Sequence, residues 1–273
     1  MFRDKFKSEE YFKKTTARIL NNLEAKKNNG LNDKPLSNIE NYVLANGLYI
    51  YVFRAYSLGD PVKNLIDPCK EMLIYNIDSI HLNEDYSDGG DIAYTELLGM
   101  VAMGVLLDAK EELYKLSLTL EKVNYRDYLI DFLLKFSRPD LVLTDKMMWP
   151  DDVACKQLRT IIQANKIDAE KEMKAYLEKY YYTKANFEDE YNSHKRTDTT
   201  YKGYWSFESA AIVKIMGLSD DGFKYSPYYP YDMLHDEPLQ PSFSPVMPLL
   251  PDEDEHKSEV SPNPPPKKKW WQF

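Results

Sequence analysis

The chain has 273 residues, 43% of them hydrophobic, and a formal net charge of −9. This length and hydrophobic content suffice for a real core, in one large domain or two small ones. The acidic balance argues against direct binding of DNA or RNA, whose phosphates would be repelled, and suits a basic protein partner. An acidic surface that only maintains solubility explains the same charge.

Charge and cysteines are unevenly distributed along the chain. Residues 1–30 carry eight Lys or Arg against four Asp or Glu, whereas residues 60–140 carry sixteen acids against eight bases. Cys69 and Cys155 form no close pair, so we expect reduced thiols and a cytoplasmic protein. The charged N-terminus has no apolar signal segment, and the longest apolar run, Leu97 to Leu107, is too short to span a bilayer.

Helical periodicity dominates the first 80 residues, without an alternating strand pattern or an Asn-Gly hairpin. Ser37 and Glu40 have capping-box spacing ahead of a helix that is apolar on most sides and should be buried. Asp60-Pro61 is expected to cap and start the next helix. One face of the first helix, which ends near Gly30, is marked by Phe12, Thr16, Ile19, Leu20 and Leu23.

A polar loop at residues 81–91 separates the helical region 3–80 from a second helical region, residues 91–236. Gly99 and Gly104 should allow a close neighbour on the buried helix that follows, and Gly217 should end the last helix. The starts of four later helices are assigned to Asn124, Pro150, Asp168 and Ser206. We therefore expect an all-α fold of about ten helices in antiparallel hairpins, followed by a disordered proline-rich tail at 237–273.

No catalytic, cofactor or metal site is indicated. The four histidines have no His, Cys or clustered acid at metal-ligand spacing, and His194 is expected to be solvated or packed in its loop. Ser193 and Ser206 lack the strand–turn–helix elbow of a nucleophile. Glu208, a lone carboxylate in a first helical turn, is expected to favour the helix dipole. These patterns predict a protein that is not an enzyme.

The most distinctive segment runs through YNSHKRTDTTYKGYWSFE and ends at SPYYPYD. Its order and spacing resemble the C-terminal signature of the PoNi immunity family, and the resemblance extends over roughly residues 3–236. The resemblance implies an α-helical immunity protein that binds and neutralises a cognate PoNe-type DNase toxin, which protects the producing cell and its kin. We assign five aromatic side chains of the signature to packing: Tyr204, Trp205, Phe207, Tyr228 and Tyr229.

Two acidic clusters are candidates for toxin contacts, because loops carry recognition and a DNase must present a basic surface to its substrate. The first is Glu84, Asp85, Asp88 and Asp91; the second is Glu188, Asp189 and Glu190. The alternative is that both clusters are ordinary solvated loop charges. A helical adaptor for a basic partner and an enzyme with an unrecognised site stay open, as do the oligomeric state and the role of the terminal KKKWWQF.

Overall fold

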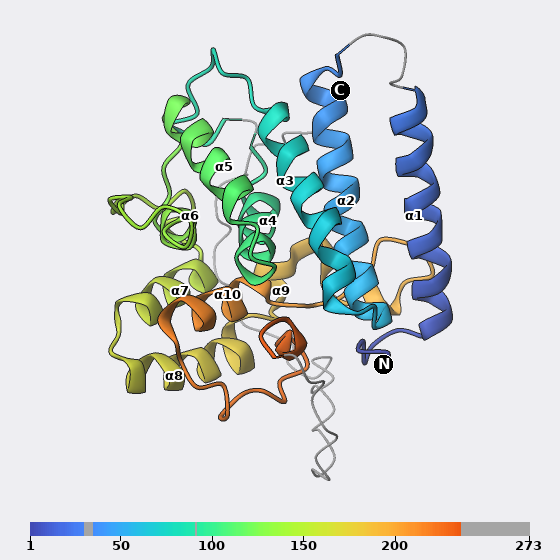
Figure 1. The fold of residues 1–273 in the computed structure, drawn as a ribbon. Coiled ribbons are helices and arrows are strands. Elements are labelled where there is room, and N and C mark those ends of the chain that lie inside the picture. Colours follow the sequence, from blue (N-terminus) through green and yellow to red (C-terminus); the bar gives the residue numbers. More distant parts are fainter. Residues whose placement is uncertain (30–34, 91, 236–273) are drawn as a thin grey trace, which may run out of the picture. The chain divides into compact units, whose positions relative to one another are not determined.

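The computed structural model describes residues 1–29, 35–90 and 92–235, so the predicted proline-rich tail lies outside the described residues. The described part contains ten α-helices and no strand, which confirms the all-α prediction (Figure 1). These helices belong to one compact unit, Met1–Leu239. The boundary between regions 3–80 and 91–236 stays a prediction. None of the described helices is long and apolar enough to cross a membrane.

The first three helices lie side by side and run in alternating directions (Figure 1). They are α1 (Glu9–Asn29), α2 (Asn38–Leu58) and α3 (Ile66–Ser79). The predicted capping box is confirmed: Ser37 N donates to Glu40 Oε2 at 2.8 Å, and Glu40 N donates to Ser37 Oγ at 3.3 Å. Two orphan backbone donors of α2 are thereby satisfied.

The cap predicted at Asp60 is wrong. Asp60 N donates to Ala55 O at 3.0 Å, so this residue belongs to the closing turn of α2, where Gly59 adopts a left-handed φ of 100°. The chain then enters a 3-10 turn, Val62–Leu65, that has no side-chain cap. Pro61 rather than Asp60 takes the N-cap position of this turn, and proline has no side-chain acceptor to cap it.

The middle helices are α4 (Tyr94–Leu106), α5 (Lys110–Lys122) and α6 (Tyr128–Leu134). Close packing at Gly99 and Gly104 is confirmed, because a Cβ at Gly99 would lie 2.4 Å from the Tyr49 hydroxyl. The cap predicted at Asn124 is wrong. Asn124 adopts a positive φ of 58° after α5, and Asp127 caps α6 by accepting from two backbone N–H groups.

The remaining helices are α7 (Val153–Gln163), α8 (Lys166–Ala175), α9 (Lys184–Phe187) and α10 (Phe207–Met216), with a π-helical turn, Tyr176–Tyr180, after α8. The starts assigned to Pro150 and Asp168 are wrong by a few residues. Asp152 caps α7 and Asn165 caps α8, each by accepting from the backbone N–H three residues later.

The sequence predicted that the Ser206 side chain caps α10. Ser206 does directly precede α10, but its side chain makes no capping hydrogen bond. Its hydroxyl donates to Glu208 Oε1 at 2.7 Å instead. The other end of α10 agrees with the sequence, because Gly217 adopts the left-handed conformation with φ of 61°. The helix packs mainly on α4.

Candidate functional site

All five signature aromatic side chains are buried, and Trp205 is 6% exposed. The Trp205 indole Nε1 donates to Ser57 Oγ at 2.8 Å, and its ring packs edge-on against Tyr56 at 5.0 Å. Phe207 makes a similar T-shaped contact with Phe53 at 4.7 Å. The signature therefore holds the start of α10 against the C-terminal half of α2.

Within the signature, the hydroxyl of Tyr204 contacts the turn that contains Ser193 and His194. It lies 3.0 Å from His194 Nδ1 and 3.2 Å from Ser193 Oγ. Burial, with Lys195 and Lys7 nearby, lowers the pKa of His194. Ser193 is 3% exposed, so a substrate cannot reach its hydroxyl. His194 thus packs within its loop, one of the two arrangements that the sequence predicted.

Glu208 is not the lone carboxylate that the sequence suggested. Its Oε1 accepts hydrogen bonds from Ser206 Oγ at 2.7 Å and from Tyr176 OH at 3.0 Å. Burial raises the pKa of this carboxyl, and the two hydrogen bonds oppose that rise. Glu208 therefore joins α10 to the π-helical turn. Tyr176 is 32 residues away along the chain, so spacing gave no signal of this pair.

The buried carboxylate of Asp127 positions the loop between α6 and α7. Asp127 Oδ2 accepts from Met148 N at 2.8 Å, and Asp127 Oδ1 lies 3.3 Å from the hydroxyl of Tyr94. Cys155 and Cys69 are free and buried, and burial raises the pKa of both thiols. In the described ranges, no group of three His, Cys, Asp or Glu side chains could hold a metal ion.

The first acidic cluster lies on an anchored loop. Glu84, Asp85 and Asp88 are exposed, whereas Tyr86 between them is buried and its N–H donates to Val123 O at 2.8 Å. Asp85 Oδ1 accepts from Ser87 N at 2.8 Å, and Asp88 Oδ1 accepts from Gly90 N at 3.1 Å. These short-range bonds fix the loop while leaving the carboxylates open to a partner. Asp91 lies outside the described residues.

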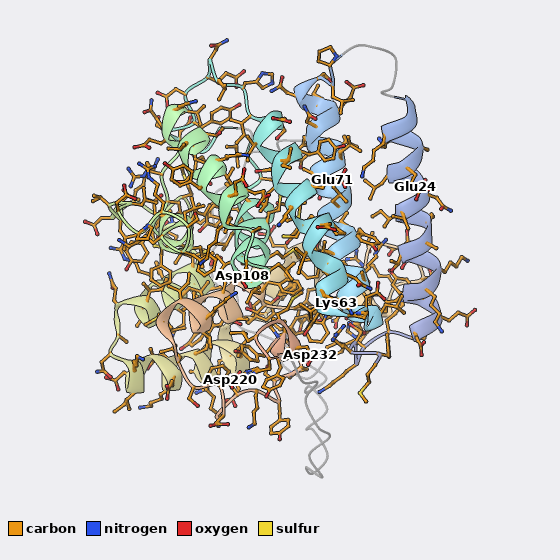
Figure 2. The ribbon with its side chains drawn as sticks, viewed as in Figure 1. Glu24, Lys63, Glu71, Asp108, Asp220 and Asp232 are labelled. Carbon is orange, nitrogen blue, oxygen red and sulfur yellow. The ribbon has the colours of Figure 1, made fainter. Side chains whose placement is uncertain are left out.

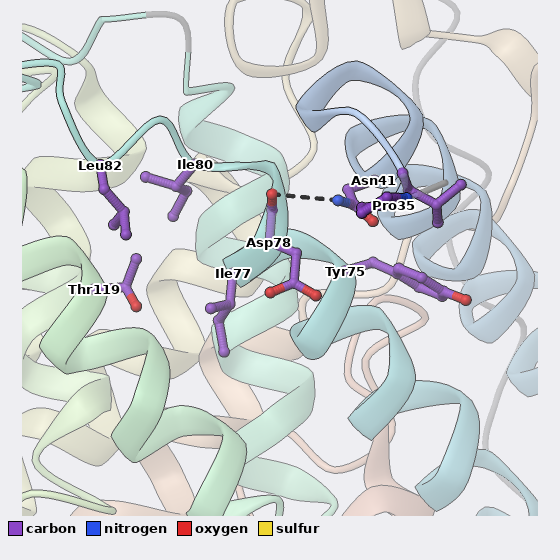
Figure 3. A pocket seen from close by; sticks show the side chains of 9 residues that line it. Pro35, Asn41, Tyr75, Ile77, Asp78, Ile80, Leu82 and Thr119 are labelled. Atoms are coloured by element: carbon purple, nitrogen blue, oxygen red, sulfur yellow. Dashed lines mark hydrogen bonds between the residues drawn. The ribbon is translucent and has the colours of Figure 1, made fainter. Parts of the chain in front are cut away.

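A pocket of about 470 Å³ with a mixed polar and apolar lining lies at the start of this loop (Figure 3). Leu82, which is 57% exposed, lines it together with Ile77 and Ile80. Asp78 supplies the negatively charged side chain of the lining, and Asn41 Nδ2 donates to the Asp78 carbonyl at 3.3 Å (Figure 3). Sequence reasoning missed this pocket, because its walls come from separate helices.

An exposed aromatic side chain lies at the other end of the loop. A Cβ at Gly89 would lie 3.7 Å from Met148 Sδ, so the loop lies close to the 145–149 segment. Trp149, in that segment, is 44% exposed and packs on Tyr94 at 4.9 Å. We name the whole region the loop surface: residues 82–90 with the pocket at one end and Trp149 at the other. The sequence signal for this exposed side chain was Trp149 followed by Pro150, a large aromatic residue outside a helix.

The second acidic cluster is exposed but partly neutralised by nearby cations. Glu190 forms an ion pair with Lys202 at 2.7 Å, and the carbonyl of Asp189 accepts from Arg196. The Glu190 carbonyl accepts from Tyr204 OH at 3.3 Å, so this cluster is attached to the signature. The two acidic clusters lie apart in Figure 1 and do not form one patch.

Comparisons with known proteins show the fold and identify the C-terminal region. The crystal structure of protein PA2201 from Pseudomonas aeruginosa is similar, with a TM-score of 0.63 over 86% of this chain and 90% of that one. At 17% identity this likeness shows the fold alone. A comparison with curated proteins found no match. Residues 125–233 match the family model described as PoNe immunity proteins (PoNi), C-terminal. Residues 125–233 are therefore identified as a C-terminal domain of the kind found in PoNi proteins, the immunity proteins for PoNe toxins.

Proposed function

We propose that this protein neutralises a cognate PoNe-type DNase toxin in the cytoplasm of the bacterium that makes both, and so prevents self-intoxication. The observation that carries the proposal is the match of residues 125–233 to the PoNi family. A net charge of −9 supports a protein partner with a basic face rather than a nucleic acid.

The loop surface is the proposed toxin contact. Protein interfaces commonly place aromatic or aliphatic anchors in the centre and charges at the rim. The loop surface offers Trp149 as an aromatic anchor and the pocket as a place for an anchor of the partner. The carboxylates of Glu84, Asp85 and Asp88 lie between them. Because residues 188–190 are partly neutralised by Lys202 and Arg196, they offer less negative potential to a basic partner.

Inhibition would follow from competition for the basic face of the toxin. A DNase binds the phosphates of its substrate with Lys and Arg side chains. Carboxylates that cover those cations exclude DNA electrostatically and sterically. The same charges accelerate encounter, because complementary potentials steer association.

The first test asks whether a PoNe-type toxin gene lies beside this gene, and whether co-expression with that toxin is rescued. The protein should restore growth, co-purify with the toxin and stop DNA cleavage by the purified toxin. Rescue without binding, or binding to a toxin that is not a nuclease, would contradict the proposal.

The second test removes the loop charges and keeps the loop conformation. Glu84→Gln, Asp85→Asn and Asp88→Asn together retain the side-chain oxygens that accept from Ser87 and Gly90. We expect toxin affinity to fall at least tenfold, about 1.4 kcal/mol. The matched control removes three exposed acids elsewhere, Glu24→Gln, Asp140→Asn and Glu178→Gln. Equal losses in both triple variants would show that general charge, not this surface, mediates binding.

A further inference from the structure

Two arginine side chains from different helices converge on one residue. Arg18 of α1 donates from Nη2 to Thr199 Oγ1, and Arg54 of α2 donates from Nη2 to the Thr199 carbonyl. Arg54 Nη1 also donates to the Thr15 carbonyl, at 3.4 Å. Both guanidinium groups therefore lie beside Thr199.

Neither guanidinium has an acidic partner among the residues that the structure places. Arg54 is 4% exposed, and its Nε has no hydrogen-bond partner there. Burial lowers the pKa of Arg54, the nearby Tyr11 opposes that shift, and the charge of Arg18 adds to it. A buried cation without a counter-charge is costly, and a second cation beside it adds to the cost. An anion bound at this point would remove both penalties.

The surrounding surface is also basic. Lys14 and Arg18 are exposed and lie four residues apart on one face of α1. Lys7 Nζ donates to the carbonyls of His194 and Arg196, 2.6 Å each, which joins the basic N-terminus to the segment after the second acidic cluster. Asp198 is the acid of this segment, and its Oδ1 accepts from Thr200 N and Oγ1.

We infer that Arg18, Arg54 and Thr199 form a binding site for an oxyanion, either a phosphate or a carboxylate group. Arg18 offers an exposed planar fork that matches the geometry of both oxyanions. The buried charge of Arg54 raises the positive potential at that fork. The Thr199 hydroxyl, held by Arg18, is oriented as an additional donor. This site is separate from the loop surface and does not depend on the proposed function.

The test measures thermal unfolding of the full chain in sodium phosphate, in sodium malonate and in sodium chloride at equal ionic strength. At ten times the dissociation constant, a bound oxyanion should raise Tm by roughly 3–6 °C over chloride. A response to phosphate identifies phosphate chemistry, and a response to malonate identifies a carboxylate. Either one supports the site only if Arg18→Gln weakens it at least tenfold.

Lys13→Gln is the matched control, since it removes one exposed charge from the same helix but away from Thr199, where Lys13 pairs with Glu9 at 2.7 Å. This variant should retain the wild-type response to the oxyanion. The site is refuted if neither anion stabilises the wild type beyond chloride. It is also refuted if Arg18→Gln and Lys13→Gln respond alike.

Discussion

Trp205 contacts α2 across a long sequence separation. Its indole donates to Ser57, 148 positions away, and its ring lies against Tyr56. Replacing Trp205 with Ala leaves a cavity and removes the hydrogen bond that Ser57 Oγ accepts from the indole. We expect Trp205→Ala to lower the free energy of unfolding by about 3–5 kcal/mol, measured by denaturant titration. Tyr225→Ala, at a side chain 45% exposed, should change it by less than about 0.5 kcal/mol. A stable Trp205→Ala protein that no longer binds toxin would instead place this ring in the interface.

Glu208 predicts a pH dependence of stability. Its pKa is raised in the folded state, so the folded state binds a proton more readily than the unfolded chain. Above the folded pKa the buried charge costs stability, and this cost disappears as pH falls toward the unfolded pKa. Relative to Glu208→Gln, which is neutral throughout, the wild type should therefore gain stability as pH falls from about 7 to about 5. Denaturant titrations at both pH values measure the difference, and a constant or reversed difference contradicts this assignment.

At the scale of elements, the N-terminal segment ties the end of α2 to the end of the described chain. Arg3 Nε donates to Asp232 Oδ2 at 2.6 Å, and its Nη1 donates to the carbonyls of Tyr56 and Asp60; Asp232 is labelled in Figure 2. Both side chains are largely buried, 14% and 16% exposed. Contacts between residues this far apart in the sequence explain why residues 3–80 and the signature occur within one compact unit.

Arg3→Ala should lower the free energy of unfolding by about 3 kcal/mol, because it leaves the Asp232 carboxylate largely buried and unpaired. The exposed Lys5→Ala should change it by less than about 0.5 kcal/mol. Adding Asp232→Ala to Arg3→Ala should cost less than Asp232→Ala alone, since the partner is already gone. Strictly additive losses in this double-mutant cycle would show that the ion pair contributes nothing.

Helix identity was predictable from the sequence, whereas most helix starts were not. The Ser37–Glu40 capping box was predictable because its two residues are only three positions apart, so their spacing identifies them. Asn124, Pro150 and Asp168 failed because another Asp or Asn within three residues makes the capping hydrogen bond. Glu208 with Tyr176 and Arg18 with Thr199 required the tertiary fold. The exposed acids could be selected from composition, but the pocket and Trp149 beside them could not be placed.

At the scale of the whole molecule, charge governs how the protein meets a basic partner. Long-range steering acts over about 10 Å at 0.1 M salt and over about 3 Å at 1 M. Steering therefore changes the association rate far more than the dissociation rate. Because the loop acids are exposed and Glu190 is paired, the loop surface should contribute more to steering than residues 188–190.

Association with the toxin should slow by roughly tenfold or more between low salt and 0.5 M salt, measured by stopped-flow mixing. The variant with Glu84→Gln, Asp85→Asn and Asp88→Asn should associate more slowly than the wild type at low salt. The two rates should converge at high salt, because salt then screens the wild-type charges that the variant lacks. A gap that persists at high salt would mean that these residues act through contacts rather than steering. A wild-type rate insensitive to salt would exclude electrostatic steering, because no screened charge would then contribute to the encounter.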